Sequence, residues 1–381
     1  MLRHKLIRKI FIFLLLFLFG CFFARSSYAS SDVYLKGTVA KVLSAGVTAS
    51  FGVKTYTEVL AVTMLEGKDA GKTIKMAFQT DGTFGGNEKI AAGTTIIIDA
   101  KATKAGTTYS VYEPYRLNFL WTVVALFIVL IVAVAWLKGI GALIGMSISL
   151  ATIVVYIVPQ IVKGTDPLTV CVIGAIFILL VTTYIAHGIS LKTTVAIIST
   201  GIALALAAWL ATLAVHVGNL TGLGNDDVYN IQLGSVHPIN PQGLLLGSIL
   251  IGTLGALNDI TTTQAITIFS FAKENPTQHF WHLFIKSMHI GTEHIASLVN
   301  TLVLAYAGTS LAVFIFLALN PTQLPWWIIL NNETTMEEII RTIVGSAGLI
   351  LAVPITSILA TAVALYGKKF IDTLWWNIAG D

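Results

Sequence analysis

From residue 117 onward, the chain consists largely of apolar stretches that are each about as long as a transmembrane helix. About 20 apolar residues are needed to cross the hydrocarbon core of a bilayer. Seven stretches qualify: 119–137, 140–160, 168–187, 193–216, 244–271, 293–319 and 340–366. Only 11% of the 381 residues are charged, against about 25% in soluble domains. The sequence therefore predicts a polytopic α-helical membrane bundle over residues 116–370, followed by a short cytoplasmic tail, 371–381.

Basic residues predict how the bundle is oriented. Lys138, Lys192, Lys273 and Lys368 follow the first, third, fifth and seventh stretches, whereas the loops 217–243 and 320–339 contain no Lys or Arg. Lys and Arg accumulate on the cytoplasmic side. We therefore expect a multi-pass protein of a bacterial cytoplasmic membrane, with residues 31–118 outside and the C-terminus inside. The net charge of +4 reflects this distribution, and we predict no nucleic-acid partner.

The first 30 residues resemble a targeting segment. Four basic residues precede an apolar run of about fourteen residues, 10–23, which is short for a span. Ser27 and Ala29 offer a small-x-small cleavage site for a signal peptide. An uncleaved anchor is the alternative, and a lipoprotein signal ending at Cys21 is a third. All three place residue 31 outside the cytoplasm.

Residues 31–115 have the pattern of a small β-rich domain. Short β-prone runs at 33–42, 56–64, 73–78, 94–100 and 108–112 alternate with glycine-containing turns. Five strands in so short a segment predict an antiparallel barrel of the OB type or a sandwich. An aromatic platform for stacking bases is not evident, so a substrate-gathering or partner-docking module is the preferred interpretation.

Two acidic residues lie where a charge is costly. Asp259 is inside the apolar stretch 244–271, and Glu293 lies at the start of the next one. Charged residues are rare inside membranes and mark pathways or polar cavities. Helical spacing puts further polar residues beside each carboxylate. The candidate pathway residues are Asn258, Asp259, Thr262, Thr263, Glu293, Ser297, Asn300 and Thr301.

These carboxylates have two interpretations. A low-dielectric environment favours the neutral form of a carboxyl group, so it can exchange protons near neutral pH, while hydroxyl and amide oxygens can bind a cation. Alternatively, each acid is a buried hydrogen-bonding group that stabilises helix packing. His289 and Glu293 are spaced for metal binding, but interfacial histidines are usually only polar-face residues. We predict no metal and no cofactor. Pro354 should kink the last helix.

Several short motifs resemble the YibE/F-like family of bacterial membrane proteins. They are Gly-Ala-Leu-Asn-Asp at 255–259, Gly-Thr-Glu at 291–293, 300–306, 344–348 and Ala-Val-Pro at 352–354, within a similarity that extends from about residue 37 to 366. The family has an apolar residue where this chain has Asn258, and Arg where it has Thr292. The resemblance implies the fold and a transporter-like activity.

The sequence therefore favours a transporter or permease for an ion or small polar solute, in contact with the lipid bilayer. A membrane scaffold or accessory subunit, whose β-domain binds an envelope or protein partner, is the alternative. Homo-oligomers are compatible with both. We do not predict an enzyme, because the chain has no HExxH, GxSxG, CxxC or phosphate-binding loop motif.

Overall fold

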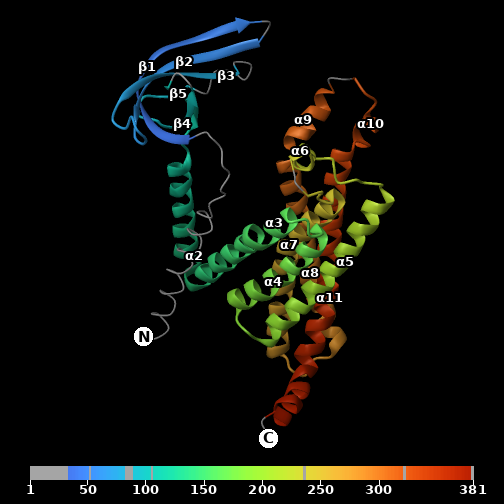
Figure 1. Cartoon of the computed structure of the whole chain (residues 1–381). Helices are drawn as coiled ribbons and strands as arrows, with labels where there is room; N and C mark the ends of the chain where they lie inside the picture. Colours follow the sequence, from blue (N-terminus) through green and yellow to red (C-terminus); the bar gives the residue numbers. More distant parts are fainter. Residues whose placement is uncertain are drawn as a thin grey trace, which may run out of the picture. The chain divides into compact units, whose positions relative to one another are not determined.

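The computed structural model describes residues 33–50, 53–81, 89–103, 106–234, 237–320 and 323–378. The predicted targeting segment, 1–30, lies outside the described residues. The chain divides into a β-rich unit that extends to Val134 and a helical unit that begins at Ala135 (Figure 1).

The β-rich unit contains one curled antiparallel sheet of five strands. They are β1 (Val33–Ser50), β2 (Val53–Met64), β3 (Thr73–Asp81), β4 (Thr95–Thr103) and β5 (Gly106–Pro114), in the order β3-β2-β1-β4-β5. The edge strands β3 and β5 contact each other, which curls the sheet. The five predicted strands are confirmed, although β1 extends eight residues beyond its predicted end at 42 and forms a long hairpin with β2. Because all five strands belong to one sheet, the predicted sandwich is not formed.

Alternation along the strands explains the core of this unit. Leu60, Val62 and Met64 occupy every second position of β2 and are almost fully buried, as are Ile96 and Ile98 of β4. Successive side chains of a strand point to opposite faces, so these residues line the inner face of the curled sheet. The result is a compact apolar core.

The helical unit contains most of the long helices. After α2 (Leu117–Ala151) come the π-helix η2 (Thr152–Ile157) and α3 (Val158–Val162), α4 (Pro167–His187), α5 (Leu191–Val217), α6 (Asp226–Gly234), α7 (Pro241–Glu274), α8 (Phe280–Thr309), α9 (Leu311–Leu319), α10 (Trp326–Leu330) and α11 (Glu333–Ile378). Among the described residues, six helices are long and apolar enough to cross a membrane, or seven if α8 and α9 form one span. These helices coincide with the seven predicted stretches.

Helix α7 lies at the centre of the bundle. It contacts α4, α5, α8 and α11. Because α5 also contacts α4 and α11, and α11 contacts α8, the four helices surround α7 in the order α4, α5, α11, α8 (Figure 1). The side of α7 between α8 and α4 remains uncovered.

Two of the apolar helices are interrupted. Trp136 has a positive φ of 49° and separates Leu117–Trp136 from Lys138–Val162. The stretch 293–319, predicted as one span, is bent by 68° between α8 and α9. The Thr309 hydroxyl donates to the Tyr306 carbonyl, and the Ser310 N–H bonds to the carbonyls of Tyr306 and Gly308. These local hydrogen bonds end α8 inside an otherwise apolar run, a break that the sequence analysis did not predict.

Helix α11 continues through Pro354 without a break. The Thr356 hydroxyl donates to the Ala352 carbonyl at 2.7 Å, in the turn that contains the proline. The helix also passes the predicted boundary at 370 and ends at Ile378.

The first residue of α11 fixes a distant loop. One oxygen of Glu333 accepts hydrogen bonds from the Thr221 hydroxyl at 2.7 Å and from the Gly222 N–H at 3.1 Å. One turn later, Glu337 accepts from the Gly224 N–H at 3.0 Å. The loop that leads from α5 toward α7 is therefore held by carboxylates of α11.

Candidate functional site

Asp259 lies on the uncovered side of α7. Between Gly243 and Phe271, six residues of this helix are exposed, and all are small or polar: Ser248, Gly252, Gly255, Asp259, Thr263 and Ser270. Successive members are three, four or seven positions apart, so they form one line along the helix. We call this line the open stripe. A helix face that contacted lipid would expose apolar side chains instead.

The glycines leave room in front of Asp259. A Cβ atom added to Gly255 would have no neighbour within 4 Å, and one added to Gly252 would lie 3.4 Å from the Tyr306 hydroxyl oxygen. These glycines are therefore not required for close packing within the described residues. They keep the open stripe shallow next to the carboxylate.

Helix α4 borders the open stripe on one side. The Thr183 hydroxyl donates to the side-chain oxygen of Asn258 at 2.8 Å. His187, the last residue of α4, interacts electrostatically with Asp259, and Lys138 and Lys192 act on the same imidazole. Asp259 therefore has an electrostatic partner on α4, although 72 residues separate it from His187 in the sequence.

A buried amide fixes α8 on the other side. Gln264 is fully buried and its side-chain nitrogen donates to the Ser287 carbonyl and to the Ser357 hydroxyl, both at 2.9 Å. Gly291 permits this contact, since a Cβ there would lie 2.4 Å from Val353. The sequence analysis did not select Gln264, although a glutamine inside an apolar stretch was a signal of the same kind as Asp259.

The second group of predicted residues lies on another face. Gly291 of α8 contacts α7 and α11, and Glu293 and Asn300 are two and nine positions further on, which places them on the opposite side of the helix. Both are exposed, as are Ser297 and Thr301. Within the described residues, Glu293 and Asp259 share no hydrogen bond or ion pair. The structure therefore brings Asn258, Asp259 and Thr263 together, and places the α8 residues apart from them.

Two candidate residues remain, Thr262 and His289, and they differ in burial. Thr262 is buried, and its hydroxyl has no hydrogen-bond partner among the described residues. His289 is exposed. The described residues contain no group of three or more His, Cys, Asp or Glu side chains that could hold a metal ion, so His289 and Glu293 have no third ligand there.

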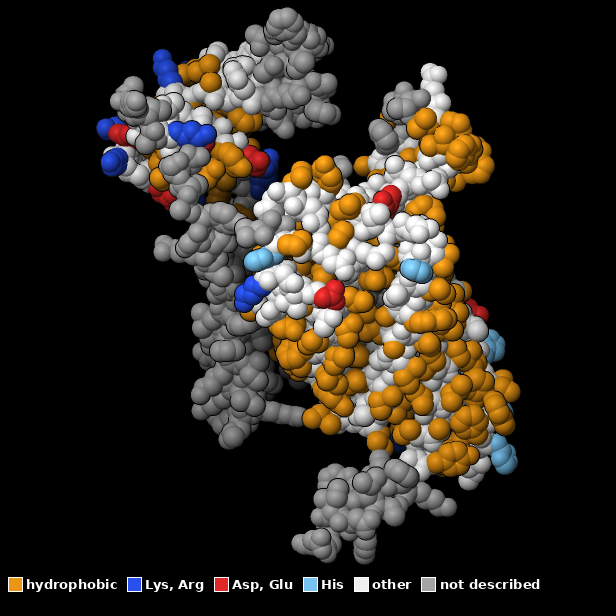
Figure 2. Space-filling model, turned by 45° about the vertical axis from the view of Figure 1, so that its right-hand side comes forward, with side chains coloured by type: hydrophobic (Ala, Val, Ile, Leu, Met, Phe, Trp, Pro, Cys, Tyr) orange, Lys and Arg blue, Asp and Glu red, His pale blue; other side chains and the backbone are white. Residues whose placement is uncertain are grey.

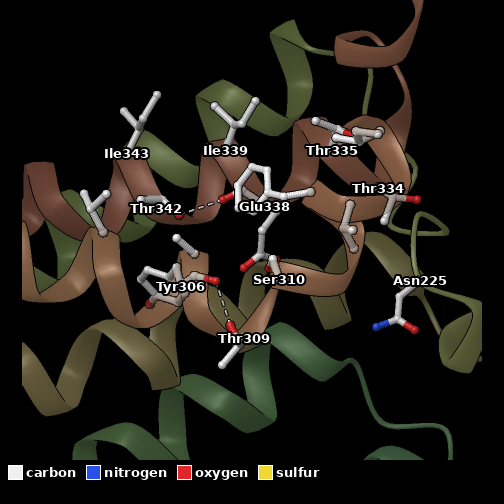
Figure 3. A pocket seen from close by; sticks show the side chains of 15 residues that line it. Asn225, Tyr306, Thr309, Ser310, Thr334, Thr335, Glu338, Ile339, Thr342 and Ile343 are labelled. Atoms are coloured by element: carbon white, nitrogen blue, oxygen red, sulfur yellow. Dashed lines mark hydrogen bonds between the residues drawn. The ribbon is translucent and has the colours of Figure 1, made fainter. Parts of the chain in front are cut away.

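A cavity that the sequence analysis missed, with a mainly apolar lining, lies at the break between α8 and α9. It is bounded by these two helices and by the first turns of α11, and Tyr306, Ser310 and Glu338 lie around it (Figure 3). Its walls come from residues 225, 303–317 and 334–343. A break within an apparently continuous span was not foreseen, and neither was a cavity formed by it.

These features are those of a multi-pass helical membrane protein. On the face shown in Figure 2, hydrophobic side chains cover most of the described surface of the long helices, and charged ones are few. YibE/F-like protein is the family whose model matches residues 123–365, and the chain belongs to this family. The match begins at residue 123, after the last strand, β5, so it supports the resemblance for the helical part of the chain. Neither a curated protein nor a solved structure matches the chain.

Proposed function

We propose that this protein is a permease of a bacterial cytoplasmic membrane that moves an ion or a small polar solute. Residues 31–118 would lie outside and the C-terminus inside. The open stripe of α7 carries the proposal, because none of its exposed residues has a large apolar side chain. In a bilayer, such a face must border water or another polar surface.

Asp259 is the coupling residue in this proposal. It lies in the middle of the open stripe, where its carboxylate can bind a cation or take up a proton. Thr262, Thr263 and Asn258 supply oxygen atoms nearby, and His187 stabilises the charged carboxylate when it is itself protonated. The polar face of α8, formed by Glu293, Ser297, Asn300 and Thr301, would extend the pathway in an assembly that shields it from lipid, such as a homo-oligomer. The β-rich unit would gather solutes or dock a partner.

Ion flux in proteoliposomes tests the proposal. Wild type, Asp259→Asn and Glu274→Gln would be compared under an imposed pH gradient and membrane potential. Glu274 is an exposed carboxylate at the far end of α7, so Glu274→Gln controls for neutralisation of an acid as such. We expect flux in wild type and in Glu274→Gln, and flux at the background level in Asp259→Asn.

Equal flux in all three proteins would refute a role for Asp259. If wild type carries no flux under any ion or solute tested, while deletion of 31–115 abolishes recovery of a binding partner, the scaffold function is the better explanation. Folding of each variant is checked by its melting temperature in detergent.

A further inference from the structure

The cavity at the break of α8 and α9 has the properties of a binding site for an organic cation. Its volume is about 370 Å³, which is within the range of about 300–1,000 Å³ typical of sites for small molecules. Its walls come mainly from α8, α9 and α11 and include no residue of the open stripe, although a Cβ added to Gly252 of that stripe would lie 3.4 Å from the hydroxyl of the lining residue Tyr306. Discontinuous helices form the solute sites of many transporters.

Glu338 gives the cavity its charge. It is the one acidic or basic side chain among the residues that line the cavity. Figure 3 shows its carboxylate directed toward Ser310, at the break. The hydroxyl of Thr342 bonds to the backbone carbonyl of Glu338 and not to its carboxylate.

The end of α8 adds to the negative potential. The helix has 30 residues and ends at Thr309, beside the cavity. The C-terminus of an α-helix carries a partial negative charge from its carbonyl groups. A carboxylate and a helix C-terminus at one cavity both favour a positively charged ligand.

Arg341 is the cation that Glu338 holds in the described structure. The two side chains are 3.3 Å apart, one turn of α11 from each other, and both are partly exposed. The Nε atom of Arg341 is buried and has no hydrogen-bond partner within the described residues, so the guanidinium is incompletely satisfied in this position. A ligand cation would compete with this guanidinium for the carboxylate of Glu338.

The apolar part of the cavity lining suits a ligand with an apolar body. It consists of aliphatic and aromatic side chains: Val303, Val313, Phe314, Leu317, Ile339 and Ile343. The rings of Tyr306 and Phe314 also present faces to which an ammonium group is attracted. A naked metal ion would leave these walls without a partner.

We infer that this cavity binds an organic ammonium ion, with its nitrogen at Glu338 and its apolar body between α9 and α11. The inference rests on the proposed function only in that the ligand would be the transported solute. Binding itself can be measured independently of transport.

Isothermal titration calorimetry on the full chain in detergent tests this inference. The probes are 2-phenylethylammonium and its neutral counterpart 2-phenylethanol. We expect saturable binding of the ammonium ion and at least about tenfold weaker binding of the alcohol, because a charge-assisted hydrogen bond is lost. Glu338→Gln should weaken ammonium binding by about tenfold or more, and Glu274→Gln should leave it unchanged.

Arg341→Gln supplies a test of opposite sign. It removes the competing cation, so ammonium binding should become about two- to tenfold tighter. If the Glu338–Arg341 ion pair only stabilised the fold, ammonium binding should be weaker or absent in both Glu338→Gln and Arg341→Gln. Equal affinity for the two probes in wild type, or wild-type affinity in Glu338→Gln, would overturn the inference.

Binding and transport can fail separately. Ammonium binding without flux would retain this site and reject the permease. Flux that depends on Asp259, combined with absence of ammonium binding, would retain the permease and reject this ligand class.

Discussion

Helices α5 and α7 pack against each other, yet their uncovered faces have opposite compositions. The large exposed side chains of α5 are apolar and include Ile198, Ile202, Trp209 and Leu213. Between Gly243 and Phe271, α7 instead exposes only the small or polar residues of the open stripe, among them Asp259. Both helices are long and apolar enough to cross a membrane, so total hydrophobicity does not distinguish them.

The difference shows that the exposed faces of the two helices are suited to different surroundings. The face of α5 suits hydrocarbon, whereas that of α7 would leave a carboxylate and hydroxyl groups in lipid without partners. At their shared interface the two helices are alike, because Thr200 and Thr261 form a buried hydrogen bond of 2.6 Å. The two helices therefore differ in their exposed side chains and not in those at their shared interface.

A leucine in the open stripe should have the largest effect. Gly255→Leu fills the space next to Asp259, so flux in proteoliposomes should fall to the background level. The matched control is Gly201→Leu on α5, since a Cβ at Gly201 also has no neighbour within 4 Å. Its flux should equal that of wild type. Equal flux in the two variants would remove the functional distinction between the helices.

Alanine substitutions at Gly291 and Gly255 distinguish a packed helix face from an exposed one. Gly291→Ala places a Cβ 2.4 Å from Val353 and should lower the free energy of unfolding by about 1–3 kcal/mol. Gly255→Ala meets no neighbour and should not lower stability, because alanine is the better helix former. Denaturant titration in detergent measures both. Similar losses would show that the open stripe is packed in the folded protein.

Asp166→Ala should cost about 1 kcal/mol, as expected for an N-cap. The carboxylate accepts from the Thr169 N–H at 2.9 Å and its hydroxyl at 2.8 Å, and these bonds hold the pKa of Asp166 below its usual range. A lowered pKa means that the stabilisation is present above the unfolded-state pKa and is lost as the pH falls below about 4. The melting temperatures of wild type and variant should therefore converge in acid. A constant difference down to pH 3 would contradict the cap.

The smallest effect is expected at the contact that the two helices share. Thr200→Val removes one hydroxyl, but Thr261 keeps the Asn258 carbonyl as acceptor at 3.2 Å. The loss in unfolding free energy should be about 0.5 kcal/mol, with unchanged flux. A strong loss of flux would show that the pathway reaches between α5 and α7.

Local patterns were sufficient to predict much of this structure. Short β-prone runs between glycine-containing turns predicted the five strands, and apolar length predicted the helices, because burial of these residues dominates their conformation. The line from Gly255 to Thr263 also follows from helical spacing alone. The sequence could not show that Glu293 points away from Asp259, since the orientation of α8 depends on the fit of Gly291 against Val353.

Tertiary contacts explain what was missed. His187 acts electrostatically on Asp259 because α4 and α7 pack together. Ser357 meets Gln264 across 93 residues. The break after Thr309 arises from hydrogen bonds within one turn, which apolar content conceals. The cavity at Glu338 exists only because of that break.

The hydrogen bonds that Glu333 accepts affect the order in which the protein folds during its synthesis. The loop residues Thr221 and Gly222 lie more than 110 positions before their acceptor. A ribosome adds about 5–20 residues per second. This loop is therefore synthesised roughly 6–20 s before Glu333. Until then, the connection between α5 and α7 has no carboxylate to bind, and these two helices must find each other without it. The last helix thus completes the earlier part of the bundle, and a nascent chain that stops before α11 would retain a loose turn.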